Sequence, residues 1–142
     1  MHIFNDRFFR IMFQTGSFYN LLVGLTGILF YNFTIKMMFG PEALDDSFVA
    51  AIFFRMFMLA VVIFGIGYFI VSMDLKNNHG IVWLGAISKV IVCAKMGYFY
   101  ISGLATNFVL IGIFPDVVFT VLFLIFLGNG SKRDGCMARS GS

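Results

Sequence analysis

Four ionisable side chains interrupt otherwise apolar stretches of the sequence: Arg55, Lys89, Lys95 and Asp116. A charge at the centre of a membrane helix costs about 2.5–3.5 kcal/mol on insertion scales, so such a residue generally has a partner or a function. The depth of each charge, and the direction in which its side chain leans, decide which of the four need a partner.

Lys95 and Asp116 are predicted to form an ion pair inside the membrane. Lys95 lies about six residues, or ~9 Å, below the outer surface, and its side chain leans toward the membrane centre. Asp116 lies about eleven residues, or ~16 Å, below the same surface and leans outward. Because the two side chains converge in depth from consecutive spans, each can neutralise the other.

Arg55 and Lys89 admit a simpler explanation. Arg55 is about seven residues, or ~10 Å, from the outer surface, and Lys89 is about eight residues, or ~12 Å, from the cytoplasmic surface. Each leans toward its nearer surface, so each can extend its charged end to water. A functional role and simple snorkelling are both open for these two residues.

A polar candidate site is predicted in the outer half of the protein. Two cations and one anion there leave an excess charge of +1, which an acidic ligand, a lipid headgroup or an acidic partner residue could balance. Pro115 removes the hydrogen bond to the carbonyl of Ile111 and adds polarity beside Asp116. The candidate ligand-binding residues are Tyr31, Asn32, Arg55, Lys95, Tyr98 and Asp116.

The composition places these charges in a membrane protein. Of 142 residues, 60% are hydrophobic and 12% are charged, whereas soluble domains carry about 25% charged residues. No basic stripe suggests nucleic-acid binding. His2 and His79 are peripheral, and no C-x-x-C motif occurs. We therefore expect no metal, no haem, no disulfide exchange and no other cofactor.

Four apolar segments are each long enough to cross a bilayer. The expected fold is all-α: a single-domain, polytopic four-transmembrane-helix bundle. Residues Phe4 to Phe13 form either a short interfacial helix or an extension of the first span. The expected spans are residues 16–35, 48–72, 81–101 and 105–127, followed by a polar, mobile tail over residues 128–142.

The lysines and arginines outside the spans predict the orientation. Lys36 alone lies on one side, together with acidic residues, whereas the other side carries six basic residues. Basic residues favour the cytoplasmic side, so both termini are expected to be cytoplasmic, in a bacterial inner membrane. The six residues are Arg7, Arg10, Lys76, Lys132, Arg133 and Arg139.

Small and polar residues recur at helical spacing along the first span. Such a stripe lets membrane helices pack closely, although contact with a ligand is an alternative. Its members are Ser17, Asn20, Gly24, Gly27 and Tyr31.

The segment "GILFYNFTIK", from Gly27 to Lys36, resembles the first helix of DoxX-like membrane proteins. That pattern has a glycine, an aromatic residue three positions later and a lysine at the helix end, matched here by Gly27, Phe30 and Lys36. Phe33 departs from it, because a small residue is usual there. The resemblance implies a four-helix bundle, and some members of the class are accessory subunits of membrane oxidoreductases.

The leading functional hypothesis is a non-enzymatic accessory or binding protein that holds an acidic group at the outer-half site. Its expected partners are membrane lipids and either another membrane protein or further copies of this chain. One alternative is a small proton-coupled transporter or channel acting as an oligomer. A second is a membrane enzyme for a lipid-soluble substrate, with Asp116 as acid or base; no catalytic residue is otherwise predicted.

Overall fold

A computed structural model describes residues 5–43 and 48–139 of the chain. Within these ranges every regular element is a helix. In chain order the elements are α1 (Asp6–Leu29), α2 (Tyr31–Phe39), the short 3-10 helix η1 (Pro41–Ala43), α3 (Phe48–Met73), α4 (His79–Ile101) and α5 (Phe108–Arg139).

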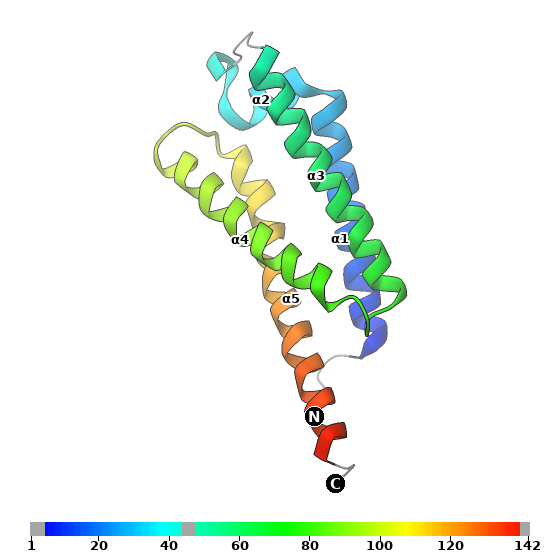
Figure 1. The fold of residues 1–142 in the computed structure, drawn as a ribbon. Helices are drawn as coiled ribbons and strands as arrows, with labels where there is room; N and C mark the ends of the chain where they lie inside the picture. The colour runs from blue at the N-terminus through cyan, green and yellow to red at the C-terminus, as the bar shows by residue number, and fades with distance from the viewer. Residues whose placement is uncertain (1–4, 44–47, 140–142) are drawn as a thin grey trace.

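The long helices form two antiparallel pairs. α1 packs along α3, and α4 packs along α5. The two pairs diverge toward the end at which α2 lies and converge toward the end that holds the start of α1 and the α3–α4 loop (Figure 1). We call the first the α2 end and the second the core end.

Aromatic rings fill the core end, where all four long helices meet. Phe13, Tyr68 and Phe123 are fully buried, and the Phe13 ring lies 5.2 Å from that of Phe123 and 5.1 Å from that of Phe126. Phe9, one turn earlier on α1, contacts Phe126 at 5.0 Å. Large aromatic side chains therefore join the two pairs at this end.

The interfacial helix considered for residues 4–13 is not present as a separate element. α1 is continuous from Asp6 to Leu29, which agrees with the alternative of an extension; Phe4 lies outside the described residues. The physical reason is packing. Phe9, Met12 and Phe13 belong to the buried core, so this face is already covered by protein.

The first expected span, residues 16–35, is broken in the structure and is not one continuous helix. The chain leaves the helix at Phe30, whose φ and ψ are −117° and 49°, and the axes of α1 and α2 differ by 106°. No proline stands at the break. Contacts at the far end of α2 fix its direction: Thr106 donates from its backbone N–H to the Met38 carbonyl at 2.8 Å and from its hydroxyl to the Met37 carbonyl. These carbonyls belong to the last turn of α2, where the helix itself supplies no N–H donors for them.

The turn between α4 and α5 has a glycine where the backbone requires one. Gly103 has φ of 72°, and its N–H donates to the Tyr100 carbonyl at 3.1 Å. The Leu104 N–H donates to the Phe99 carbonyl at 2.9 Å. This is a Schellman motif, which ends α4 and reverses the chain into the expected hairpin.

The loop between α3 and α4 is organised by Asp74. Its carboxylate accepts hydrogen bonds from the Asn77 amide at 2.7 Å and from the backbone N–H groups of Lys76 and Asn77. These bonds, first that of the Asn77 side chain, hold the pKa of Asp74 below its ordinary value. The loop is therefore a defined turn.

Three helices are long and apolar enough to cross a membrane: Phe48–Met73, His79–Ile101 and Phe108–Gly128. They coincide within about three residues with the expected second, third and fourth spans. The bent pair α1 and α2 meets the same criterion only when taken together. α5 continues past the expected span end at residue 127 as far as Arg139.

Candidate functional site

The central polar feature of the structure is an ion pair between α4 and α5. Lys89 Nζ donates a hydrogen bond to Asp116 Oδ1. The lysine side chain is 7% exposed and the aspartate side chain 19% exposed. A cation and an anion buried this far from water interact strongly, because little solvent screens them. The pair connects the two helices of the α4–α5 hairpin.

The prediction that Lys95 neutralises Asp116 is wrong, because Lys89 occupies that position. The buried face of α4 carries Val82, Gly85, Ala86 and Lys89. Lys95 lies six positions after Lys89, about 120° away around the helix, and it is exposed. Depth alone favoured Lys95, but the rotational face of α4 decides which lysine reaches α5. Gly85 and Ala86 lie four and three positions before Lys89, so these small residues could have indicated that Lys89 is on the face of α4 that packs against the protein.

Two aromatic rings flank the ion pair and shield it further. Lys89 Nζ lies 5.9 Å from the centre of the Tyr68 ring on α3 and 5.8 Å from that of the Phe119 ring on α5. Both distances permit a cation–π interaction, which is stronger where water is excluded. The pair therefore lies at the junction of the two helix pairs and also contacts α3.

The region around Pro115 receives a hydrogen bond from α1, which the sequence did not indicate. The Tyr19 hydroxyl donates to the Gly112 carbonyl at 3.3 Å, one residue after the carbonyl that Pro115 leaves without its helical donor. On the other side, the Thr120 hydroxyl donates to the Asp116 carbonyl at 2.7 Å. The polar groups near Asp116 are thus largely satisfied by the chain itself.

The other candidate residues do not form one site with Asp116. Arg55 is exposed, and its guanidinium carbon lies 5.8 Å from the centre of the Tyr31 ring. Asn32 is exposed on α2. Tyr98 is 63% exposed and lies beside Phe99. The structure thus brings together Arg55 and Tyr31, whereas Asn32, Lys95 and Tyr98 are exposed side chains.

The identity of the ion pair changes the charge balance at the α2 end. Asp116 is neutralised by Lys89, so it no longer offsets Arg55 or Lys95. Among the residues that the structure describes, neither of these two cations forms an ion pair. Arg55 and Lys95 therefore carry an excess of two positive charges, one more than the +1 expected when Asp116 was counted with them.

The stripe of small residues on α1 packs against neighbouring helices. A Cβ at Gly24 would lie 2.6 Å from Val62 Cγ2 and 2.9 Å from the Met58 carbonyl oxygen, and one at Gly27 would lie 2.6 Å from the Met58 side chain. A Cβ at Gly16, next to the stripe, would lie 3.3 Å from the Phe119 ring. These contacts agree with the packing interpretation of the stripe.

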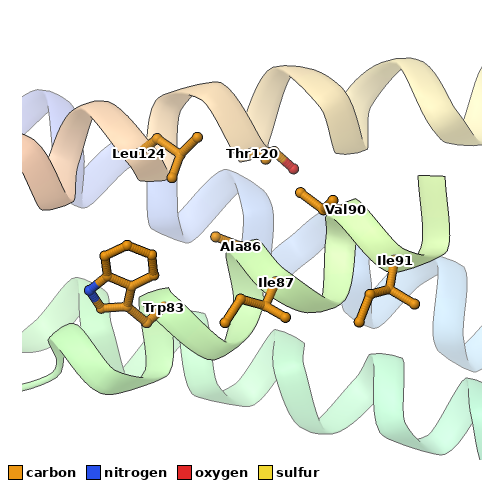
Figure 2. Close-up of a pocket in the computed structure, with 7 residues that line it drawn as sticks. All are labelled: Trp83, Ala86, Ile87, Val90, Ile91, Thr120 and Leu124. Atoms are coloured by element: carbon orange, nitrogen blue, oxygen red, sulfur yellow. The ribbon is translucent and has the colours of Figure 1, made fainter. Parts of the chain in front are cut away.

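A shallow groove of about 270 Å³ lies between α4 and α5 (Figure 2). Apolar side chains of both helices line it, and the hydroxyl of Thr120 is engaged with its own helix. The groove therefore offers hydrocarbon contact and no polar anchor. Its lining is Trp83, Ala86, Ile87, Val90, Ile91, Thr120 and Leu124. Among the described residues, no three histidines, cysteines or acids gather where they could hold a metal ion.

Comparisons of the chain with protein-family models, with curated proteins and with solved structures gave no match. The resemblance to DoxX-like proteins stays a prediction, and the segment that carries it now proves to contain the break at Phe30. The function has to be inferred from the residues and their geometry.

Proposed function

We propose that the chain is a non-enzymatic integral membrane protein that binds an anionic group through Arg55 and Lys95. The observation that carries this proposal is the pairing of Asp116 with Lys89, which leaves both cations without an ion-pair partner among the described residues. Both side chains are exposed on helices apolar enough to span a membrane. An anion bound there would supply the opposite charge that these two cations lack among the described residues.

Phospholipid phosphate is the anion that we propose for this site. Arg55 lies seven residues after the start of α3 at Phe48, about 10 Å along the axis, so its side chain extends to headgroup depth. An acidic residue of a membrane-protein partner would satisfy the same chemistry. An accessory protein could use the two cations for either purpose.

The Arg55→Gln/Lys95→Gln double variant tests this proposal. Each cation near a headgroup contributes about 1 kcal/mol, so we expect affinity for a fluorescent phosphatidylglycerol in detergent to fall about 30-fold. Lys76→Gln, an exposed lysine of the α3–α4 loop, is the matched control and should retain affinity. Equal binding of phosphatidylglycerol by the double variant and by the Lys76 variant would remove the basis for anion binding.

The proposed orientation places the amino end, the α3–α4 loop and the end of α5 in the cytoplasm of a bacterial inner membrane. Support comes from the charge distribution and from α1, which packs along the full-length candidate span α3. α1 has 24 residues, about 36 Å of helix, which exceeds the ~30 Å hydrocarbon thickness.

Reporter fusions should place the residue after Ala43 outside and the residue after Asn77 inside. The decisive site is the amino end, because only a membrane-crossing α1 separates it from Ala43. We therefore expect alkaline phosphatase to be active after Ala43, and a cytoplasmic reporter to be active at the amino end, after Asn77 and after Gly128. If the amino end and Ala43 report the same side, α1 does not cross and the chain has three spans.

The proton-coupled alternative has one observation in its favour, the buried acid–base pair that links α4 and α5. Transport would require Asp116 to exchange its proton or its partner during a cycle. Proteoliposomes that show proton-driven flux, lost in Asp116→Asn, would favour this alternative over a binding protein.

A further inference from the structure

α2 divides its surface into three strips, each with a different environment. One strip faces the protein, with Ile35 at 7% exposure and Tyr31, Thr34 and Met38 half-buried. The second strip is exposed and polar and consists of Asn32 and Lys36. The third is exposed and apolar and consists of Phe33 at 59% and Met37 at 37% exposure.

The two exposed strips lie side by side along the helix. Asn32 and Lys36 are four positions apart, as are Phe33 and Met37, so each pair forms a line parallel to the axis. The two lines are about 100° apart around the helix. In water, the apolar line would remain exposed without stabilising the helix. In hydrocarbon, burying the lysine charge would be unfavourable. A boundary between water and hydrocarbon accommodates both.

The direction of α2 agrees with such a boundary. Its axis is turned by 106° from that of α1, which is 16° from a right angle. If α1 crosses the membrane beside α3, α2 runs nearly parallel to the membrane surface. Gly40, with φ of 90°, and the Thr106 hydrogen bonds to Met37 and Met38 hold the far end of α2 against the α4–α5 turn.

We propose that α2 is an interfacial helix that binds the outer-leaflet lipid surface. Phe33 and Met37 enter the acyl-chain region, Asn32 and Lys36 lie among the headgroups, and the Lys36 cation complements anionic phospholipid. This proposal rests on the membrane insertion proposed above but uses neither Arg55 nor Lys95. It assigns the interfacial position to residues 31–39 instead of the amino-terminal segment.

Single cysteines at residues 32, 33, 36 and 37 test the proposal in a Cys93→Ser/Cys136→Ser background. Each variant is placed in phosphatidylethanolamine–phosphatidylglycerol nanodiscs at one chain per disc and treated with a water-soluble maleimide. We expect labelling at 32 and 36 to be about tenfold faster than at 33 and 37, after normalisation to the unfolded chain, because lipid covers only the apolar strip. Single occupancy excludes protection by a second copy or another protein.

The comparison is internal to one helix, so the sidedness of the membrane cannot produce the difference. A second readout identifies lipid as the cover: in a Trp83→Phe background, Phe33→Trp should be quenched by acyl-chain-brominated lipid more strongly than Lys36→Trp. Equal labelling at all four positions would overturn the proposal by placing α2 in water. Protection at all four would overturn it by placing α2 within the hydrocarbon. Whether the Arg55/Lys95 variant keeps or loses its phosphatidylglycerol affinity changes neither result, so the two proposals fail separately.

Discussion

Replacing Asp116 with alanine is expected to reduce the free energy of unfolding by about 3–5 kcal/mol, because it leaves the Lys89 charge buried without a partner. Lys89→Ala should cost a similar amount by stranding the carboxylate. The double replacement Lys89→Met/Asp116→Leu should recover most of the loss, since it removes both charges and keeps apolar volume. SDS titration of the purified protein in detergent measures these differences.

Lys95→Ala is the matched control for the ion pair. Lys95 is a lysine on the same helix, but it is exposed and makes no ion pair among the described residues. Its replacement should change the stability by less than about 0.5 kcal/mol, as for most surface substitutions. If Lys95→Ala lowers the free energy of unfolding as much as Lys89→Ala does, Lys95 also pairs with Asp116 or pairs with it in place of Lys89. The ion pair described above would then be incorrect.

The positions of three helices followed from the sequence because long apolar runs and their polar breaks are local features. The "MDLKNNHG" and "SGLAT" segments each end one helix and allow the next to begin. The Gly103 turn of the second segment forms its hydrogen bonds with Phe99 and Tyr100, at most five residues earlier in the chain. Such features are predictable because hydropathy and turn chemistry act over a few residues.

The bend at Phe30 and the partner of Asp116 were not predictable in the same way. The bend carries no proline, and its direction depends on Thr106, which is 76 residues later than Phe30 in the sequence. The ion pair depends on the rotation of α4 about its own axis. Depth along a helix can be counted from its ends, whereas rotation is set by the packing of all neighbouring helices.

The candidate site was correspondingly only half predictable. The four charges within apolar helices, and the existence of a pair that includes Asp116, followed from the cost of burying charge. The grouping of Tyr31, Asn32 and Tyr98 with that pair did not follow, because a shared depth does not place residues on facing sides of a bundle. Tyr19 was missed because its bond to the Gly112 carbonyl joins α1 to α5, which are distant in sequence.

Gly24→Leu is expected to separate α1 from α3. A Cβ at Gly24 would lie 2.9 Å from the Met58 carbonyl oxygen and 3.1 Å from the Val62 nitrogen. Both are backbone atoms, so α3 cannot relieve the overlap by moving a side chain. Even Gly24→Ala should cost about 1–3 kcal/mol through overpacking, and the three further carbons of leucine should cost more. SDS titration of the single variants measures the loss.

Two other glycines provide matched comparisons for this substitution. Gly27→Ala should be milder, because the overlapping atoms are Met58 Cγ and Sδ, which a flexible side chain can move. Gly97→Ala on α4 meets nothing within 4 Å, and it should be neutral or stabilising by up to about 1 kcal/mol, since alanine favours the helix more than glycine does. The expected order of stability is therefore Gly97→Ala, Gly27→Ala, Gly24→Ala and Gly24→Leu. If Gly24→Leu is as stable as Gly97→Ala, α1 and α3 do not approach closely at this position, and the pairing on which the membrane-crossing direction of α1 depends is incorrect.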